Sequence, residues 1–600
     1  MGEKRRKEFS EKSKAALFAS NFFDQVARAV AGPPKAGYCD LMTADGETMC
    51  DLPWQEYPRP QLKRDSYLNL NGKWEFAISS GRQIPESFPM QILVPFPPES
   101  LLSGIHKVPG RYQYLYYRRK FMLPEGFVKD KVLLHFGAAD QIATVYVNGR
   151  EMTTHAGGYL PFSIDSTDSL EEENTIIVKV KDHLSHALPY GKQRRKRGGM
   201  WYTPVSGIWQ TVWLESVSDD YIRRLKIIPS LDSVTIRVDS AASWKEIWIK
   251  TEDGIVRKRF EGREIKIAIE HPRLWSPEDP YLYEFEMKTP GDAVTSYFAL
   301  RTISVMESGG VSRLCLNGKP YFFHGVLDQG YHSDGIFLPA SIKGYRRDIE
   351  TMKELGFNTL RKHIKIEPAW YYYLCDKLGM VVFQDMVNMG HYSYFRNSVL
   401  PALGYTGGND TRQFRTKAVK RNFEKHMSRT IRHLYNHPSI CCWTIFNEGW
   451  GQFDSDRMYE AAKKSDNGRI VISRSGWFHQ KSSDVLSRHV YFDKIAVSGG
   501  GRPVVLSEFG GYSYKLQDHS CNSKKTYGYR FFQGEQEFQN ALNEVYLNEV
   551  AGQIKNGLCA SIYTQVSDVE DETNGFFTYD RKVLKVKPEE MKKIAAWLKI

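Results

Sequence analysis

The stretch CCWTIFNEGWGQFD, residues 441–454, places an unbroken apolar run directly before Asn447 and Glu448. A carboxylate at the end of a buried segment is costly, because an apolar environment disfavours its charged form. A short apolar run of this kind is typical of a fully buried β-strand. We therefore expect a strand whose carboxyl end opens into a reactive cleft, with Glu448 at the edge of that cleft.

Seven similar apolar runs lie on either side of this stretch and alternate with helical patterns. The eight predicted strands are YFFHGVLD (321–328), NTLRKH (358–363), MVVFQDM (380–386), CCWTIFNE (441–448), IVISRSG (470–476), VLSRHVYF (485–492), PVVLSEFGG (503–511) and CASIYTQV (559–566). One intervening helix is SIKGYRRDIETMKEL, with Ser341 as its N-cap and Ile342, Tyr345, Ile349 and Met352 along one face. Eight such units predict a C-terminal (β/α)8 TIM barrel over residues 307–600, with its chemistry at the carboxyl ends of the strands.

The preceding residues show short β-rich runs separated by turn signals. Residues 51–216 contain seven such runs and an Asn148-Gly149 hairpin turn, which predict a jelly-roll-like β-sandwich. Residues 217–306 contain about seven shorter runs and predict an immunoglobulin-like β-sandwich. Residues 1–50 form an N-terminal extension that we leave unassigned. A chain of 600 residues exceeds one hydrophobic core, so a multidomain protein is expected.

Composition limits the classes of partner. No run of about 18 apolar residues is present, which argues against a membrane span, and residues 15–32 resemble an amphipathic helix more than a secretory segment. The net charge of +12 includes two basic clusters, Lys4–Lys7 and Arg194–Arg197. Neither cluster lies in a nucleic-acid-binding module, so a solvated tail or loop is the favoured interpretation. Eight cysteines without a disulfide framework indicate a cytoplasmic protein.

Two glutamates stand out among the polar residues at the predicted strand ends. Glu448 ends the fourth run and Glu508 the seventh, so the two would face each other across the mouth of an eight-stranded barrel. A carboxylate pair about 5 to 5.5 Å apart supplies the acid and the nucleophile for retaining glycoside hydrolysis. Glu448 would keep its proton until it donates to the leaving oxygen, and Glu508 would stay ionised. The alternative, that each glutamate only pairs with an arginine, is less favoured for two residues at this face of the barrel.

Longer motifs around these glutamates resemble a known family. NHPSICCWTIFNE (436–448), followed by SEFGG (507–511), is similar to glycoside hydrolase family 2, the family of β-galactosidases, β-glucuronidases and β-mannosidases. The stretches YPRPQLKRDSYLNLNGKWEF (57–76), HFGAADQIATVYVNG (135–149), HAGGYLPFSID (155–165) and SGIWQTVWLE (206–215) resemble that family's sugar-binding domain. The resemblance runs from about residue 54 to the end of the chain and implies the same order of sandwich, immunoglobulin-like domain and barrel.

The resemblance also implies roles for individual residues. Glu448 would be the acid/base and Glu508 the nucleophile, while Asn447 would hold the sugar 2-hydroxyl. Arg361 would keep the nucleophile ionised, and Tyr491 would donate a hydrogen bond to it. Further predicted substrate contacts are His363, Asp385, His489, Trp477 and Tyr563. No organic cofactor is expected and no metal ligands are predicted, because His363 and His391 beside Asp385 lack metal-ligand spacing; Mg²⁺ or Na⁺ near the pocket stays open.

Departures from the family pattern bear on the substrate. Ile364 stands where β-galactosidases carry a histidine, and QDM (384–386) is closer to β-mannosidases. The stretch EDETNGFFTYDR (570–581) lacks the Asn-x-Lys pair expected of a β-glucuronidase. We rank a β-galactoside first, then a β-mannoside or another neutral glycoside, and a β-glucuronide last.

These observations predict a retaining exo-β-glycosidase that acts on a small glycoside, with a homo-oligomer possible. The alternatives are a carbohydrate-binding protein without catalysis and a nucleic-acid-binding protein that uses the basic clusters. Trp201, Tyr202 and Trp450 could stack on a sugar or belong to the core. The basic loop at residues 189–204 could reach the barrel mouth and meet an acidic glycan, or could contact nothing.

Overall fold

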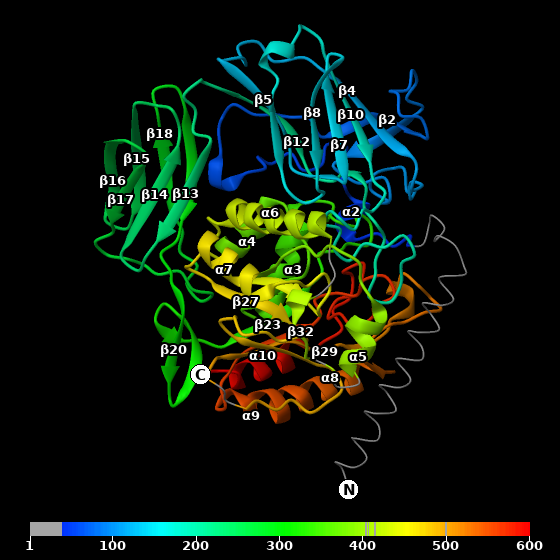
Figure 1. Cartoon of the computed structure of the whole chain (residues 1–600), viewed down its shortest axis with the longest axis vertical. Coiled ribbons are helices and arrows are strands. Elements are labelled where there is room, and N and C mark those ends of the chain that lie inside the picture. The colour runs from blue at the N-terminus through cyan, green and yellow to red at the C-terminus, as the bar shows by residue number, and fades with distance from the viewer. Residues whose placement is uncertain (1–38, 403–404, 406, 413–415, 499–500) are drawn as a thin grey trace.

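The computed structural model describes residues 39–402, 405, 407–412, 416–498 and 501–600. The Lys4–Lys7 cluster and the predicted helix at 15–32 lie outside the described residues. Figure 1 shows a β-sandwich at the top, a second sandwich at the left and a barrel below both. The three-part architecture predicted from the sequence is therefore confirmed.

The first sandwich contains two antiparallel sheets. The larger has the order β3 (Met90–Val94), β2 (Gly72–Ser79), β4 (Tyr114–Phe121), β10 (Asn174–Lys181), β7 (Ile142–Val147), β8 (Arg150–Ala156). The smaller has the order β1 (Leu68–Asn69), β12 (Val212–Val217), β5 (Lys131–Phe136), β9 (Phe162–Asp165), and β6 (Ala139–Asp140) pairs separately with β11 (Gly207–Ile208). Alternate residues of β10 are buried, so its inward face supplies Ile176, Val178 and Val180 to the core. Asn148 and Gly149 form the predicted turn, with φ of 47° and 80°.

The second sandwich is smaller and also antiparallel. One sheet has the order β13 (Arg224–Pro229), β14 (Ser233–Asp239), β17 (Glu264–Ala268). The other has the order β16 (Gly254–Glu261), β15 (Trp244–Thr251), β18 (Tyr283–Lys288), β19 (Ala293–Phe298). A three-stranded sheet of β20 (Ile303–Ser308), β21 (Val311–Leu316) and β22 (Lys319–Pro320) follows, so the division expected at 306–307 lies within β20.

The barrel contains all eight predicted strands in a single parallel sheet. The strands in chain order are β23 (Phe323–Asp328), β24 (Thr359–Lys362), β25 (Val381–Asp385), β26 (Ile440–Asn447), β27 (Ile470–Ser475), β28 (Leu486–Val490), β29 (Val504–Gly510) and β32 (Leu558–Thr564). Hydrogen bonds connect them in the order β27, β26, β25, β24, β23, β32, β29, β28. Because β27 and β28 end this order, a seam between them completes the barrel without a backbone ladder among the described residues.

Helices cover the barrel. They are α3 (Ile342–Glu354), α4 (Ala369–Leu378), α5 (Leu400–Ala402), α6 (Lys417–Leu434), α7 (Ser455–Ser465), α8 (Glu535–Glu544), α9 (Ala551–Ile554) and α10 (Pro588–Trp597), while α2 (Ala44–Glu47) precedes the first sandwich. Ser341 caps α3 as predicted, because its side chain accepts a hydrogen bond from the backbone N–H of Lys343. The four apolar residues expected on one face of α3 are all buried. A short parallel pair, β30 (Tyr512–Tyr514) and β31 (Arg530–Phe532), lies beyond β29.

The first sandwich packs directly on the barrel. Trp209 of the sandwich meets Phe337 of the barrel edge to face, with ring centroids 4.9 Å apart. The loop at 189–204 is not the solvated loop predicted from its charge. Arg195 donates to the backbone oxygens of Pro109 and Asp182, and buried Arg197 forms an ion pair with Glu570 of the barrel. Paired arginines of this kind are poorly placed to bind nucleic acid.

None of the helices in the described parts of the chain is long and apolar enough to cross a membrane.

Candidate active site

Glu448 and Glu508 meet at the carboxyl end of the barrel. Glu448 directly follows β26 in a left-handed conformation, with φ of 50°, and its backbone N–H donates to the oxygen of Ser475 at 2.8 Å. Glu508 lies near the end of β29. One carboxylate oxygen of each glutamate and one ring nitrogen of His489 lie within 4.8 Å of one another. This separation is close to the spacing of about 5 Å that retaining glycosidases use.

Glu508 is held as an anion by the groups around it. Arg361 donates from Nη1 to Oε1 at 3.0 Å, and the hydroxyl of Tyr491 donates to Oε2 at 2.5 Å. Burial of the carboxyl raises its pKa, whereas nearby His489 and Arg361 lower it. The net result is a pKa of about 2 for Glu508. An ionised carboxylate with a fixed direction can attack an electrophilic carbon.

Glu448 has a different environment from Glu508. Its side chain is 16% exposed, against 6% for Glu508, and its Oε1 lies 3.0 Å from Nδ1 of His489. Gly476 leaves the space for this contact, since a Cβ there would lie 3.1 Å from His489 Nδ1 and 3.3 Å from the Cγ of Glu448. Glu448 can therefore reach both a bound ligand and water.

Arg361, on β24, is fully occupied by protein acceptors. A guanidinium has five N–H groups, and the acceptors are Asp385 Oδ1 and Oδ2, the backbone oxygen of Ser507, Glu508 Oε1 and Asn447 Oδ1, all at 2.9 to 3.0 Å. The residue was predicted to contact substrate. Because no N–H is left for a ligand, the geometry instead gives Arg361 a positioning role.

Asp385 and His363 form the layer behind this arginine. Both are buried, and Nδ1 of His363 lies 2.8 Å from Oδ2 of Asp385. Burial raises the pKa of Asp385, but the charge of Arg361 together with the contacts from His363 and Arg361 lowers it by more, so the pKa stays below its usual value. Burial lowers the pKa of His363, which favours the neutral imidazole. Asp385 therefore orients Arg361, whereas the Nε2 side of His363 is the part that could meet a ligand.

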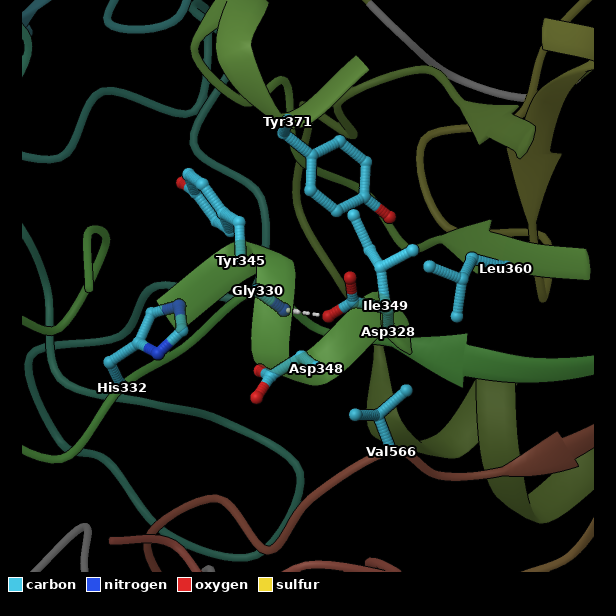
Figure 2. Close-up of a pocket in the computed structure, with 9 residues that line it drawn as sticks. All are labelled: Asp328, Gly330, His332, Tyr345, Asp348, Ile349, Leu360, Tyr371 and Val566. Carbon is cyan, nitrogen blue, oxygen red and sulfur yellow. Dashed lines mark hydrogen bonds between the residues drawn. The ribbon is translucent and has the colours of Figure 1, made fainter. Parts of the chain in front are cut away.

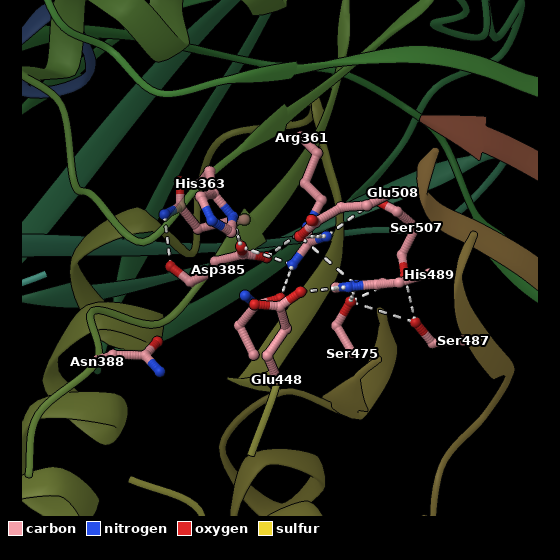
Figure 3. Close-up of polar contacts among 12 residues, drawn as sticks. Arg361, His363, Asp385, Asn388, Glu448, Ser475, Ser487, His489, Ser507 and Glu508 are labelled. Atoms are coloured by element: carbon pink, nitrogen blue, oxygen red, sulfur yellow. Dashed lines mark hydrogen bonds and ion pairs between the residues drawn. The ribbon is translucent and has the colours of Figure 1, made fainter. Parts of the chain in front are cut away.

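His489 connects the two glutamates in a way that the sequence did not indicate. Figure 3 shows its ring between Glu448 and Ser475. Its Nε2 lies 2.7 Å from Ser475 Oγ and 3.5 Å from Glu508 Oε1, and the side chain is fully buried. Ser475 and Ser487 each contact Ser507, at 2.8 and 2.6 Å. These side chains bridge the seam between β27 and β28, where backbone bonds are lacking among the described residues.

The remaining predicted contacts divide into two groups. Tyr491 reaches Glu508, and Trp477 lies edge to face with His489 at a centroid distance of 5.4 Å. Tyr563 does not join them. Its ring stacks on Phe576 at 4.7 Å, and its hydroxyl accepts the N–H of Tyr512. The structure therefore argues against the predicted substrate contact of Tyr563.

The period-two alternation of a strand explains this placement. The neighbouring Thr564 has its Oγ1 3.3 Å from the Tyr491 hydroxyl, so it faces the mouth, and Tyr563 faces the outer helices. Asn388, which the sequence did not single out, lies near the site in Figure 3. Its amide donates to the oxygen of Trp450, and its buried Oδ1 has no partner among the described residues.

Among the described residues, one group has ligand atoms close enough together for a metal ion: Glu448, His489 and Glu508. The Arg361 guanidinium lies 3.0 Å from Glu508 Oε1 and opposes a second cation there. His391 lies away from Asp385, against His186. These contacts favour an acid/base site over a metal centre.

Asp328, at the end of β23, belongs to a second cluster of buried charges and lines the small cavity drawn in Figure 2. Asp328 accepts the N–H of Gly330 at 2.8 Å and pairs with Lys362, which also pairs with Glu367 at 2.8 Å. Tyr345 and Tyr371 line the small cavity beside these charges. Because each charge is matched by an opposite one, we assign this cluster to the stability of the barrel.

A (β/α)8 barrel that follows two β-sandwiches along the chain, with paired carboxylates at its mouth, defines a multidomain enzyme of the glycoside hydrolase type. Three family models match the chain: Glycosyl hydrolases family 2, TIM barrel domain, over residues 310–600; the sugar binding domain of the same family over 101–216; and Glycosyl hydrolases family 2 over 221–301. The chain belongs to glycosyl hydrolases family 2.

Individual relatives are named as enzymes of this family, but their names refer to different substrates. A β-galactosidase of Thermoanaerobacter pseudethanolicus is 27% identical over 385 residues, which cover 59% of this chain and 47% of that protein. The β-glucuronidase of Mus musculus is 26% identical over 376 residues, which cover 56% of this chain and 54% of that protein. The matches thus span about half the length of these relatives. A solved β-D-glucuronidase of Dictyoglomus thermophilum has a TM-score of 0.72 at 20% identity, covering 90% of this chain and 98% of that one, and shows the shared fold.

Proposed function

We propose that this chain is a retaining exo-β-glycosidase that acts on neutral β-glycosides, with β-galactosides first. The observation that carries the proposal is the Glu448–Glu508 pair, whose oxygens lie within 4.8 Å of each other and whose environments differ. Glu508 is held by Arg361 and Tyr491 as a nucleophile requires, while Glu448 is more exposed and can reach a leaving group and water as an acid/base requires.

In the first step, Glu508 attacks the anomeric carbon and forms a glycosyl ester. Glu448 gives its proton to the glycosidic oxygen, so that the aglycone leaves as a neutral alcohol. Asn447, fixed by Arg361 through its Oδ1, keeps its amide N–H groups for the sugar 2-hydroxyl. In the second step, Glu448 takes a proton from water, the water oxygen attacks the anomeric carbon, and the bond to Glu508 breaks.

Two features support a neutral sugar. The stretch at 570–581 lacks the Asn-x-Lys pair expected of a β-glucuronidase and begins with the acids Glu570, Asp571 and Glu572. A β-galactosidase is also among the relatives with the highest similarity. A cytoplasmic location is part of the proposal, and is supported by the lack of a disulfide framework in the spacing of the eight cysteines.

The test is hydrolysis of p-nitrophenyl β-glycosides that differ only in the sugar, namely galactoside, mannoside, glucoside and glucuronide. We expect release of nitrophenol from a neutral member, with the β-anomer as the first sugar product by proton NMR. Initial formation of the α-anomer would contradict the retaining mechanism. Binding without turnover of any member would support the non-catalytic carbohydrate-binding alternative.

A further inference from the structure

The loop at residues 189–204 brings a lysine of the first sandwich to the barrel mouth. The backbone N–H groups of Tyr190 and Gly191 both donate to the oxygen of Asn388, which follows β25. A Cβ on Gly191 would lie 3.0 Å from the oxygen of Ile364, beside His363. The next residue is Lys192, so the barrel fixes the position of its backbone.

The other side of the same loop is fixed to the segment that follows β32. The N–H of Tyr202 donates to the oxygen of Lys192 at 3.0 Å, and the Tyr202 hydroxyl donates to Glu572 Oε2 at 2.8 Å. The N–H of Thr203 donates to Glu570 at 2.8 Å. Lys192 therefore lies between His363 on one side and Glu572 on the other.

Electrostatic effects agree with this placement. Burial raises the pKa of Glu572 to about 7, with Lys192 lowering it and Glu508 raising it. Burial and the Lys192 charge also lower the pKa of His363. The Lys192 ammonium is thus felt by both neighbours, and Glu572 is close enough to the barrel centre to be affected by Glu508.

Both side chains keep hydrogen-bonding capacity for a ligand. Lys192 is half-buried, and its ammonium makes no hydrogen bond or ion pair with the residues that the structure describes. Tyr202 and Gln565 both donate to Oε2 of Glu572, so Oε1 has no donor within the described ranges. The Lys192 ammonium can offer donors and Oε1 of Glu572 an acceptor, and the two side chains are close enough to influence each other electrostatically.

We propose that Lys192 and Glu572 are a substrate-binding pair, one from each domain, that binds hydroxyl groups of a neutral sugar and excludes a sugar carboxylate. The proposal rests on the proposed glycosidase activity and adds the residues that select the sugar. A hydroxyl can accept from Lys192 and donate to Glu572 at once. When Glu572 is ionised, above its pKa of about 7, a sugar carboxylate would meet a like charge, which disfavours it.

Two other cations of the described residues, Arg361 and Arg197, are already occupied by protein oxygens. Arg361 has all five N–H groups bound to protein oxygens. Arg197 is buried and pairs with Glu570 at 2.8 Å. Glu572 is the acid near Lys192, so a substrate carboxylate would have to compete with Glu572 for the Lys192 ammonium.

The experiment compares Lys192→Met, Glu572→Gln and the double variant on nitrophenyl β-galactoside and β-glucuronide. We expect each single substitution to lower kcat/KM on the galactoside by about tenfold or more, mostly through KM. Glu572→Gln should also raise the glucuronide-to-galactoside ratio of kcat/KM by about tenfold. The double variant should lose this gain, because the gain depends on the Lys192 ammonium.

Matched controls separate recognition from folding and from net charge. Lys179→Met removes a charge on β10 that lies over the Tyr114 ring, and Glu284→Gln removes an exposed acid of the second sandwich. Both controls should keep wild-type kinetics. Circular dichroism and the thermal midpoint report whether buried Glu572→Gln folds, and the half-buried Lys192→Met tests the proposal independently.

The possible failures are distinguishable. If the wild-type chain hydrolyses no glycoside, the proposed function fails. If it hydrolyses a neutral glycoside and both single variants match the controls, only the substrate-binding pair is refuted. A wild-type preference for the glucuronide would also overturn the pair, while the glycosidase activity would stand.

Discussion

Nδ1 of His489 lies 3.0 Å from Oε1 of Glu448, so a buried imidazole from β28 holds the carboxyl that follows β26. The ring is itself fixed by Ser475 at 2.7 Å. A side chain held at both ends in this way limits the directions in which Glu448 can turn. The acid and the nucleophile are therefore aligned through a third residue.

Replacing His489 by Ala should impair proton donation more than nucleophilic attack. Glu448 would lose its partner and its fixed direction, so kcat should fall by about 10- to 100-fold for a glycoside with a poor leaving group. A dinitrophenyl glycoside needs little protonation and should be less affected. The measurement is the dependence of kcat on leaving-group pKa, which should become steeper. An equal loss across all leaving groups would indicate a merely structural role.

The two glutamates should respond differently to removal. Glu508→Ala removes the nucleophile, so turnover should be abolished and azide should not restore it as a β-azide product. Glu448→Ala removes only the acid/base, so substrates with good leaving groups should still be cleaved slowly. Azide should accelerate this variant and yield the β-glycosyl azide, detected by mass spectrometry and NMR. Equal loss at both positions without rescue would contradict the assigned roles.

Tyr491→Phe should slow the reaction without unfolding the chain. The phenol donates to Glu508 at 2.5 Å, and its ring stacks on Tyr529 at 3.7 Å, a contact that phenylalanine keeps. A hydrogen bond to a charged group contributes about 1.5 to 3 kcal/mol, so kcat/KM should fall roughly 10- to 150-fold. The control is Tyr546→Phe, since the buried Tyr546 hydroxyl has no partner among the described residues. Similar kinetics for the two variants would refute the contact with Glu508.

Stability should depend on pH through Glu508. Its folded pKa of about 2 is depressed, because His489 and Arg361 outweigh the effect of burial. The ionised group therefore contributes stability above its unfolded pKa of about 4.3, and this contribution is lost as the pH falls toward 2. The thermal midpoint of Glu508→Gln should improve relative to wild type between about pH 4.3 and 2. The exposed Glu284→Gln is the control, and parallel curves for wild type and Glu508→Gln would contradict the expectation.

Much of the fold is predictable because its strands are short apolar runs with clear interruptions. All eight barrel strands were found within a few residues, and β23 through β32 then placed Glu448 and Glu508 at one edge. The pairing of side chains was harder to predict. Every residue of β32 is buried. The burial pattern therefore does not indicate which of Tyr563 and Thr564 faces the barrel mouth and which faces the outer helices.

The contacts that cross between segments were only partly visible in the sequence. Ser487 and His489 alternate along β28, and Tyr491 follows the strand at the same spacing of two residues, which was an available signal for the histidine bridge. The partners of the 189–204 loop carried no such signal, because Arg197 pairs with Glu570 of the barrel and the N–H of Thr203 donates to the same glutamate, 367 residues later in the chain. Charge alone suggested a solvated segment, and tertiary ion pairs gave the opposite result.

The junction between the first sandwich and the barrel has an evolutionary consequence. The strand ends that hold Arg361, Glu448 and Glu508 leave little freedom for substitution, whereas the sandwich loop and the segment after β32 meet through a few replaceable side chains. Reaction chemistry and sugar preference would then be inherited separately. Recombination of these two contacting segments as a unit, rather than exchange of either one alone, is the route by which we expect such a chain to acquire a new preference.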